Sequence, residues 1–511
     1  MHRVRHVTAW IATIIAAHIA LVSGANASSE SAASPWYQGT ITAALAEAKA
    51  QNKHILLYWG AVWCPPCNEL KSQVFSRQRF AELMRPMIAV ALDGDSEEAQ
   101  AWGEKLHVQG YPTVLLLAPG GQELMRLPTA VNIEEFEASL SNALKNPNGF
   151  DSALNRGLSG TASPDEWKLL ANYTWHEDMG KDDRDKLVQK LMVLTTNIPR
   201  EMAADRARLV TLFLTTAAAA NTDGANTAEI RQRAAKEMSW LYSDKAATLA
   251  ARSLFAYSPD VQVWLYPTGD SHSHDADQLW LQATASVAAS EDSSIDTRLW
   301  ASVAPMVLYR ARHPGTTLPS ELRDLVVREV ALSNSTAKSP YDRKAVISGA
   351  AMLLRDVGDF DGARKLLTKE LARTDTPWYL LAAAANLEKA AGNDAKALTL
   401  IAKARKSARG RASKLQWIQA DIAMTASIQN PQQVARLTKL VKDFYQTASS
   451  LDDGFQGRNA RTAAKVASAI QPLLNQRPIQ KAVAKAAQQC QKQKHPEPCQ
   501  EHFAAFGQFL N

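Results

Sequence analysis

Two cysteines separated by two residues are the part of this sequence best suited to covalent chemistry. They lie in the segment Trp63-Cys64-Pro65-Pro66-Cys67, between a predicted strand and a predicted helix. Two thiols at this spacing can close a small disulfide ring, and the unpaired N–H groups of a helix N-terminus stabilise a thiolate there. We therefore expect Cys64 to be a nucleophile with a lowered pKa and Cys67 to resolve the mixed disulfide.

Half of a zinc site and a structural clip are the other roles open to such a pair. A zinc site would need two further ligands at suitable spacing, and the only histidines between residues 36 and 146 are His54 and His107. A structural clip would leave Trp63 and the segment Gly110-Tyr111-Pro112-Thr113 unexplained. Redox chemistry is the favoured interpretation, and a redox fold that now serves as an adaptor remains its competitor.

The elements expected around the cysteine pair alternate between helix and strand. Apolar residues three to four apart indicate helices, and short apolar runs indicate buried strands. Strands separated by crossover helices imply parallel pairing, whereas two strands joined by a glycine turn imply an antiparallel hairpin. Helices are predicted over residues 40–52, 66–75, 80–84, 97–106 and 133–144, and strands over 55–59, 87–92, 113–118 and 123–127.

Residues 36–146 resemble thioredoxin-like domains, above all the periplasmic ones. The resemblance is carried by Trp-Cys-Pro-Pro-Cys and by Gly-Tyr-Pro-Thr at the start of the third predicted strand, which matches a cis-proline loop. It implies an α/β thioredoxin fold and substrate-binding roles for three residues. Pro112 would be cis and pack against the disulfide, Tyr111 would offer its backbone to a substrate strand, and Trp63 would form an apolar platform.

Two positions depart from the pattern of that family. The family often has a buried carboxylate six residues before the first cysteine, where this chain has Tyr58. Some members have a second acid seven residues after the first cysteine, where this chain has Lys71. Glu69 is close in sequence, but on a helix it need not face the sulfurs. Without that acid, exchange at Cys67 is expected either to be slower or to rely on water, while Lys71 offers a positive potential that favours a thiolate.

Ala-rich helical periodicity replaces strand-like runs beyond residue 150. A pattern recurs with a displacement of 34 residues, as Ala350, Leu353, Gly358 and Ala363 and then as Ala384, Leu387, Gly392 and Ala397. This period, with a glycine between two helices, resembles the tetratricopeptide helix pair. We expect irregular helices over 150–340, tetratricopeptide-like repeats over 341–475 and a helical tail over 476–511. A non-repeating helical domain is the alternative.

The N-terminal residues have the order of a secretory signal peptide. Arg3 and Arg5 precede an apolar stretch, and Ala25-Asn26-Ala27 offers small residues for cleavage before Ser28. The apolar stretch is shorter than the ~20 residues that a membrane span needs, which disfavours an uncleaved anchor. The sequence therefore predicts a signal peptide over 1–27, a linker over 28–35 and a periplasmic mature protein.

Export bears on the second cysteine pair, Cys490 and Cys499. In an oxidising compartment, an even number of cysteines suggests disulfides. The proline-rich segment between the two offers no helix start to activate a thiol, so a structural disulfide is favoured over a second redox pair. His495, within that segment, is interpreted as a surface residue.

Composition and charge argue against several other classes of function. The net charge of +6 is small for 511 residues, and no cluster of Lys and Arg with aromatics indicates nucleic-acid binding. No cofactor is expected. No metal is expected either, because His272 and His274 are interpreted as exposed loop residues and not as metal ligands. Tryptophans of the helical region are interpreted as core residues, some of which could line a groove: Trp240, Trp264, Trp280, Trp300, Trp378 and Trp417.

These observations favour an exported thiol–disulfide oxidoreductase that acts on protein thiols and disulfides through Cys64 and Cys67. Its helical region would recruit partner proteins, and a membrane electron donor or acceptor is a further candidate partner. The alternative hypothesis is a non-enzymatic adaptor whose thioredoxin-like domain is a docking module.

Overall fold

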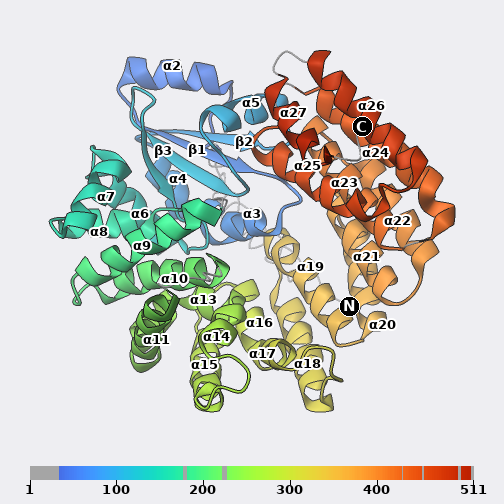
Figure 1. Ribbon diagram of the computed structural model, residues 1–511. Coiled ribbons are helices and arrows are strands. Elements are labelled where there is room, and N and C mark those ends of the chain that lie inside the picture. Colours follow the sequence, from blue (N-terminus) through green and yellow to red (C-terminus); the bar gives the residue numbers. More distant parts are fainter. Residues whose placement is uncertain are drawn as a thin grey trace, which may run out of the picture.

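The computed structural model of the chain describes residues 34–175, 181–220, 227–428, 430–451, 454–492 and 496–507. An α/β unit comes first, and every described element after it is helical (Figure 1). The predicted signal peptide and most of the predicted linker lie outside the described residues. Within these ranges, no helix is both long enough and apolar enough to cross a membrane.

A four-stranded mixed sheet with the order β2-β1-β3-β4 forms the centre of the α/β unit. β1 runs parallel to β2, with Ile55 beside Ile88, and antiparallel to β3, with Trp59 beside Thr113. β3 and β4 form an antiparallel hairpin. The strands are β1 (Ile55–Gly60), β2 (Ile88–Asp93), β3 (Thr113–Leu117) and β4 (Glu123–Leu127).

The parallel direction expected for strands that follow crossover helices is wrong for β3. The chain leaves β2 at the end of the sheet where β1 also finishes, and after α5 (Glu97–Lys105) it returns to that same end. Thr113, the first residue of β3, therefore pairs with Trp59, near the end of β1. This reversal places the Gly-Tyr-Pro-Thr loop beside the segment that carries the cysteines.

Side chains that alternate along β1 give the sheet two covered faces, because successive residues of a strand point to opposite sides. Ile55, Leu57 and Trp59 pack in one core with residues of α2 (Ile41–Gln51) and α5. Leu56 and Tyr58 pack in the other core. The elements on that second face are α3 (Pro65–Leu70), the π-helical turn η1 (Lys71–Phe75), α4 (Gln78–Met84) and α6 (Ile133–Leu144).

The helical region follows α6 and is built from helices that pack against their neighbours in the chain. Its first half consists of α7 (Gly149–Ser159), α8 (Pro164–Asn172), α9 (Lys181–Asn197), α10 (Ala203–Ala220), α11 (Thr227–Ser243), α12 (Lys245–Ala250), α13 (Arg252–Tyr257), α14 (Pro259–Leu265), α15 (Ser273–Ala288), α16 (Ile295–Ser302), α17 (Ala304–Arg312) and α18 (Ser320–Thr336). Its second half consists of α19 (Pro340–Asp356), α20 (Phe360–Leu371), α21 (Trp378–Ala390), α22 (Asp394–Ser407), α23 (Arg411–Ser427), η2 (Pro431–Gln433), α24 (Val434–Ser449), α25 (Gly457–Ile470), η3 (Gln471–Leu473), α26 (Arg477–Gln489), η4 (Cys490–Lys492) and α27 (Glu497–Ala504).

The two sequence copies with the 34-residue displacement correspond to two helix pairs, α19 with α20 and α21 with α22. Gly358 and Gly392 occupy the turns of the two pairs, with φ of +84° and +78°. Glycine adopts this left-handed conformation without the steric cost that other residues incur, which accounts for its place in both copies.

The helices form an arc that begins beside α6 and curves back to the α/β unit (Figure 1). The returning part contacts the unit through α19, which packs on α3, and through α25, whose Arg461 donates a hydrogen bond of 2.6 Å to Gln109. These contacts place the returning helices around the end of the sheet at which the cysteines lie.

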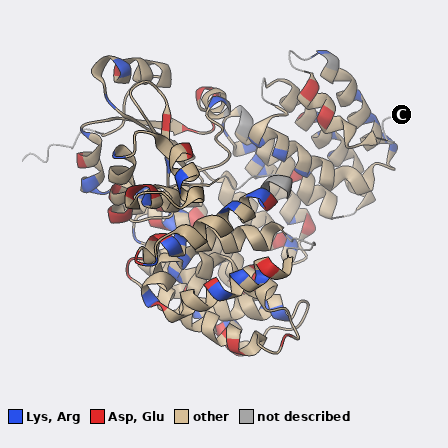
Figure 2. Cartoon of the chain, turned by 60° about the vertical axis from the view of Figure 1, so that its left-hand side comes forward, with Lys and Arg blue, Asp and Glu red and all other residues tan. Residues whose placement is uncertain are grey.

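Cationic and anionic residues are interspersed along the helices in the view of Figure 2.

The tryptophans of the helical region take different environments. Trp280 is buried in a core, and Trp240, Trp264 and Trp300 are partly buried against it. Trp378 and Trp417 are buried in another cluster, which includes residues of the α/β unit.

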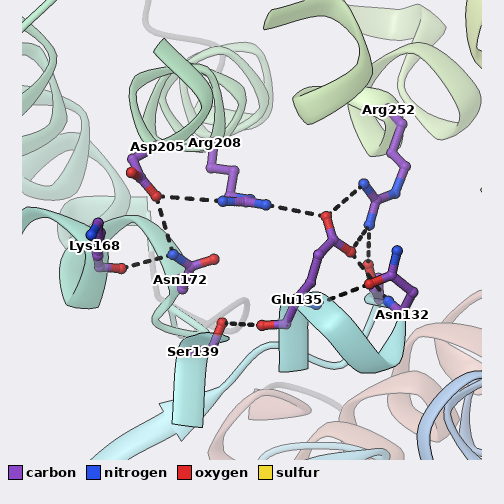
Figure 3. A network of polar contacts seen from close by, with 9 residues as sticks. Asn132, Glu135, Ser139, Lys168, Asn172, Asp205, Arg208 and Arg252 are labelled. Carbon is purple, nitrogen blue, oxygen red and sulfur yellow. Dashed lines mark hydrogen bonds and ion pairs between the residues drawn. The ribbon is translucent and has the colours of Figure 1, made fainter. Parts of the chain in front are cut away.

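Glu135 links the start of the arc to the α/β unit (Figure 3). It belongs to the capping box that begins α6, where its backbone N–H donates to the side chain of Asn132. Its carboxylate accepts hydrogen bonds from Arg208 of α10 at 3.1 Å and from Arg252 of α13 at 2.9 Å. One partly buried carboxylate thus pairs with two guanidinium groups from the helical region, and Asp205 supplies a second carboxylate to Arg208.

We expect Glu135→Gln to lower the free energy of unfolding by about 1–3 kcal/mol, because Arg252 loses its carboxylate partner and Arg208 is left with Asp205 alone. Urea denaturation of the full chain measures the loss. Glu137→Gln is the matched control, since Glu137 lies on the same helix and pairs with Arg79 at the surface, where an ion pair contributes little. Equal effects of the two substitutions would contradict the role given to Glu135.

Candidate active site

Cys64 lies at the N-cap of α3, directly after β1 and its short loop. Pro65 and Pro66 fill the first helical positions, where the missing N–H groups would have had no intrahelical partner. The Cys64 sulfur accepts a hydrogen bond from the backbone N–H of Cys67 at 3.4 Å. Asn68 steadies the turn by donating to the Cys64 carbonyl at 2.8 Å. The two thiols are therefore adjacent and located at a helix N-terminus.

The Gly-Tyr-Pro-Thr loop lies against the first thiol. The Tyr111–Pro112 peptide bond is cis, as the resemblance implies. The Cys64 thiol lies 3.8 Å from the Tyr111 carbonyl and donates a weak hydrogen bond to it. The Tyr111 hydroxyl donates to the Gly94 carbonyl at 2.6 Å. A Cβ at Gly94 would fall 2.2 Å from this ring, so only glycine leaves room for it.

Asp95 is a site residue that sequence reasoning missed. Its carboxylate accepts a hydrogen bond of 2.7 Å from the indole N–H of Trp63. Burial raises the pKa of Asp95 to about 6, although the hydrogen bond from Trp63 lowers it. A carboxylate directly after β2, the strand beside β1, was the available signal. Asp95 fixes the orientation of the Trp63 ring beside the sulfurs.

The helical region covers this site. The ring of Tyr379 in α21 stacks on Trp63 with centroids 5.7 Å apart, and Trp417 in α23 meets Trp63 edge-on at 6.1 Å. Arg458, in α25, lies over the cis-proline loop, with its guanidinium 4.5 Å from the centre of the Tyr111 ring. The residues Cys64 and Cys67 are 5% and 0% exposed in this arrangement. In this closed arrangement, the surface expected to receive substrate is occupied by the chain itself.

The helices that lie over the site, α19, α21, α23 and α25 with the turn before α23, are called the cover below, and two further contacts join them to the α/β unit. Gly410, between α22 and α23, approaches Asp95 so closely that a Cβ would fall 2.3 Å from the Asp95 carbonyl oxygen. The hydroxyl of Ser72, one turn after Cys67, donates a short hydrogen bond to Asp342 at the start of α19. The cover therefore contacts both the loop after β2 and the helix that carries Cys67.

The closed form reverses the expected acidity of the two thiols. The hydrogen bond to Cys67 and burial raise the pKa of Cys64, so the expectation of a lowered value is wrong for this form. Burial opposes ionisation of Cys67 as well, but its hydrogen bond with Cys64 and the charge of Lys71 hold its pKa below the ordinary thiol value. Exposure of Cys64 to water would remove the burial cost and make it a better nucleophile.

Glu69 does not face the sulfurs. It is partly buried against the helical region, where burial raises its pKa and Ser294 is its hydrogen-bond partner. Burial and the nearby Glu69 raise the pKa of Asp296, in α16, to about 7. The Tyr257 hydroxyl donates to Asp296 at 3.0 Å. Two carboxyl groups thus meet at the interface between α3 and the helical region.

The remaining predicted site residues lie away from this centre. Cys490 and Cys499 form a disulfide with Cα atoms 5.6 Å apart, in a core of the C-terminal helices distinct from the cluster around Cys64. His495 lies outside the described residues. His272 and His274 are exposed, and the described part of the chain holds no group of three or more His, Cys, Asp and Glu suited to a metal ion.

A groove of about 590 Å³ borders the cover. It runs between α19, α21 and α23, and its lining includes Tyr379 and Trp417, the two rings that contact Trp63. Any movement of these rings would alter both the groove and access to Cys64.

Comparison with known proteins identifies the α/β unit. Residues 41–144 match the family model of the thioredoxin-like domain. The chain therefore has a thioredoxin-like domain with a Cys64–Cys67 pair, followed by a large all-helical region.

Among solved structures, the solution structure of a thioredoxin from Thermus thermophilus is 26% identical, and the match covers 21% of this chain and 85% of that chain. The TM-score is 0.20, so this similarity adds nothing to the fold described above. No curated protein matches the chain.

We expect Gly410→Ala to loosen the cover and raise the rate at which iodoacetamide alkylates Cys64. About 1 kcal/mol of added strain against Asp95 would accelerate the reaction about fivefold, since alkylation requires opening. Mass spectrometry of the modified peptide gives the rate.

Gly392→Ala is the matched control for that substitution. Gly392 has nearly the same φ, +78° against +77° for Gly410, but a Cβ there would meet no heavy atom within 4 Å. Both substitutions place a Cβ on a backbone with positive φ, but only Gly410→Ala adds a steric clash with Asp95. Equal alkylation rates in the two variants would show that Gly410 does not hold the cover closed.

The raised pKa of Asp296 predicts that stability falls as pH rises. The folded chain keeps a proton that the unfolded chain releases near pH 3.8, so unfolding becomes easier between about pH 4 and about pH 7 and changes little above that. Asp296→Asn should remove this dependence. The measurement compares thermal midpoints of both proteins from pH 4 to pH 8, with the exposed Asp292→Asn as control. Parallel curves for the two proteins would refute the assignment.

Proposed function

We propose that this chain is an exported thiol–disulfide oxidoreductase, with Cys64 as the attacking cysteine and Cys67 as the resolving cysteine. The observation that carries the proposal is the placement of Cys64 at a helix N-cap, 3.8 Å from the carbonyl that precedes the cis Pro112. This arrangement brings a nucleophile, a resolving thiol and a backbone edge for substrate to one point. A purely structural cysteine pair would have no use for that edge.

The exchange reaction balances with these two thiols and a substrate disulfide. The Cys64 thiolate attacks one substrate sulfur, the substrate S–S bond breaks, and the first substrate thiolate leaves and takes a proton. Cys67 then loses its proton and attacks Cys64, releasing the second substrate thiolate. Cys64 and Cys67 end as a disulfide, and the substrate has gained two electrons and two protons. The reverse sequence donates a disulfide.

The helical region is proposed to control access and to recruit the partner. A protein substrate can reach Cys64 only after Tyr379, Trp417 and Arg458 move away from the site. The helix pairs α19–α20 and α21–α22 share a turn glycine at corresponding positions, which supports tetratricopeptide-like repeats. The groove beside Tyr379 is the part of these repeats closest to the redox site, and it suits a partner protein.

Export to the periplasm is proposed from the N-terminal sequence and from the cysteine content. Residues 1–27 have the order of a cleaved signal peptide. A disulfide between Cys490 and Cys499 is typical of an oxidising compartment. Protein thiols and disulfides, with a membrane electron donor or acceptor, are the partners that such an enzyme would need there.

An adaptor without redox activity is the second candidate, and the burial of both cysteines favours it. A thioredoxin-like domain whose substrate face is permanently covered would serve as a docking module for the helical region. The two candidates differ in one property, because only the enzyme needs a reversible Cys64–Cys67 couple.

We expect a reversible couple when the full chain is equilibrated in thiol–disulfide buffers and its free thiols are trapped and counted by mass spectrometry. A midpoint near about −270 mV would mark a reductase, and one near about −120 mV an oxidant. Cys64→Ser should abolish the couple, and Cys67→Ser should accumulate a mixed disulfide at Cys64. The double variant Cys490→Ala/Cys499→Ala is the control and should keep the same midpoint. Absence of any reversible couple would favour the adaptor.

A further inference from the structure

Tyr58 occupies a fixed place beside the resolving cysteine. It lies on β1 and is 4% exposed. Its ring packs edge-on against Phe75 at 4.8 Å and is tilted against Trp36 at 5.9 Å. These aromatic contacts hold the ring in one orientation, so the position of its hydroxyl is set by the core and not by a polar partner.

The hydroxyl of Tyr58 is buried, and the thiol of Cys67 is the polar group that it faces. Among the described residues, no group forms a hydrogen bond of normal geometry with this buried oxygen. The thiol of Cys67 faces it, and after burial this thiol is the largest cause that raises the pKa of Tyr58. A Cβ at Gly60 would fall 1.9 Å from the hydroxyl, so glycine at that position keeps the space open. The interaction with Cys67 is nevertheless close enough for a hydrogen bond between the two side chains to lower the pKa of Cys67, so the one polar neighbour that acts on this hydroxyl is the resolving thiol.

A cavity of about 340 Å³ joins this hydroxyl to other polar groups. Its lining includes Tyr58, Gly60, Lys71 and Asp93. The space is large enough for several water molecules, and its walls offer the polar partners that ordered water requires. Burial lowers the pKa of Lys71, while the charge of Cys67 acts in the opposite direction. Lys71 therefore lies close enough to feel the charge of the resolving cysteine.

We propose that Tyr58 is a catalytic hydrogen-bond donor to the Cys67 thiolate and that the cavity carries the Cys67 proton away past Lys71. This inference rests on the proposed redox function and names the groups that perform its second step. The Tyr58 hydroxyl is the phenol whose side-chain hydrogen bond with Cys67 favours the thiolate, and it lines the same cavity as Lys71. Lys71 is a positioning residue that acts on the thiolate through its charge.

The step balances without any additional reactant. The S–H bond of Cys67 breaks as the Tyr58 oxygen takes its proton, and Tyr58 passes one proton on to water in the cavity that it lines. Tyr58 thus ends as a neutral hydroxyl, which donates its hydrogen bond to the thiolate. The thiolate then attacks the Cys64 sulfur of the mixed disulfide, a bond forms between Cys67 and Cys64, and the substrate sulfur leaves with the electron pair.

A small aromatic disulfide, 5,5′-dithiobis(2-nitrobenzoate), separates the two steps in the full-length protein. Attack by Cys64 releases a first coloured thiolate, and attack by Cys67 releases a second. Tyr58→Phe removes only the hydroxyl. We expect it to leave the first phase unchanged and to slow the second about tenfold, the effect of raising the Cys67 pKa by about one unit. Lys71→Met should slow the second phase in the same way.

Tyr341→Phe is the matched control, because Tyr341 borders the same cavity from the helical region. It should leave both phases unchanged. A second measurement reads the Cys67 pKa directly, as the pH dependence of thiolate absorbance in Cys64→Ser with and without Tyr58→Phe. The added substitution should raise that pKa.

An unaltered second phase in Tyr58→Phe, with the same Cys67 pKa, would overturn the inference and leave the redox function intact. A wild-type protein that shows a first phase and never a second would overturn both.

Discussion

The contact of Trp63 with Tyr379 and Trp417 ties the two parts of the chain together at the cysteine pair, where the proposed redox chemistry would occur. Aromatic rings bury large apolar areas, and paired rings gain further from their geometry. Trp63 cannot turn away from these partners without leaving Asp95, which holds its indole N–H. The same ring therefore serves as the platform beside the sulfurs and as the anchor of the helical region.

This double use of Trp63 sets stability against reactivity. Every contact that closes the arc also removes water from Cys64, and loss of water raises the pKa of its thiol. The most stable arrangement is thus the least reactive one at the attacking sulfur. Cys67 is less affected, because Cys64, Lys71 and Tyr58 all favour its thiolate. Opening the arc would restore to Cys64 the advantage that its place at a helix N-terminus provides.

Local signals in the sequence were sufficient for the α/β unit. The cysteine spacing after an apolar run indicated a strand, a helix start and a redox pair, and the Gly-Tyr-Pro-Thr segment indicated the loop that approaches it. Boundaries of the predicted elements differ from the structure by at most two residues, and the helix predicted over 66–75 contains a π-helical turn. The direction of β3 escaped prediction, because it depends on where the chain re-enters the sheet and not on its own residues.

The cover could not be predicted, because it joins residues hundreds of positions apart. Nothing in the periodicity of α21 or α23 distinguishes Tyr379 or Trp417, which contact the redox site, from an ordinary core residue. Asp95 escaped although it lies only 32 positions from its partner Trp63, because the pairing of the neighbouring strands β1 and β2 brings the two residues together. The sequence correctly indicated that Glu69, on a helix, need not face the sulfurs. Only the packed structure reveals that Glu69 lies close to Asp296.

That meeting of Glu69 and Asp296 gives the closed form a consistent response to pH. Both carboxyl groups bind protons more readily when the arc is closed, because closure removes them from water and brings them together. Rising pH therefore opposes closure at this interface. It also favours the thiolate of Cys64, which closure disfavours. The two effects have the same sign although they act at opposite ends of α3, so the closed arrangement favours the protonated form of the groups at both ends.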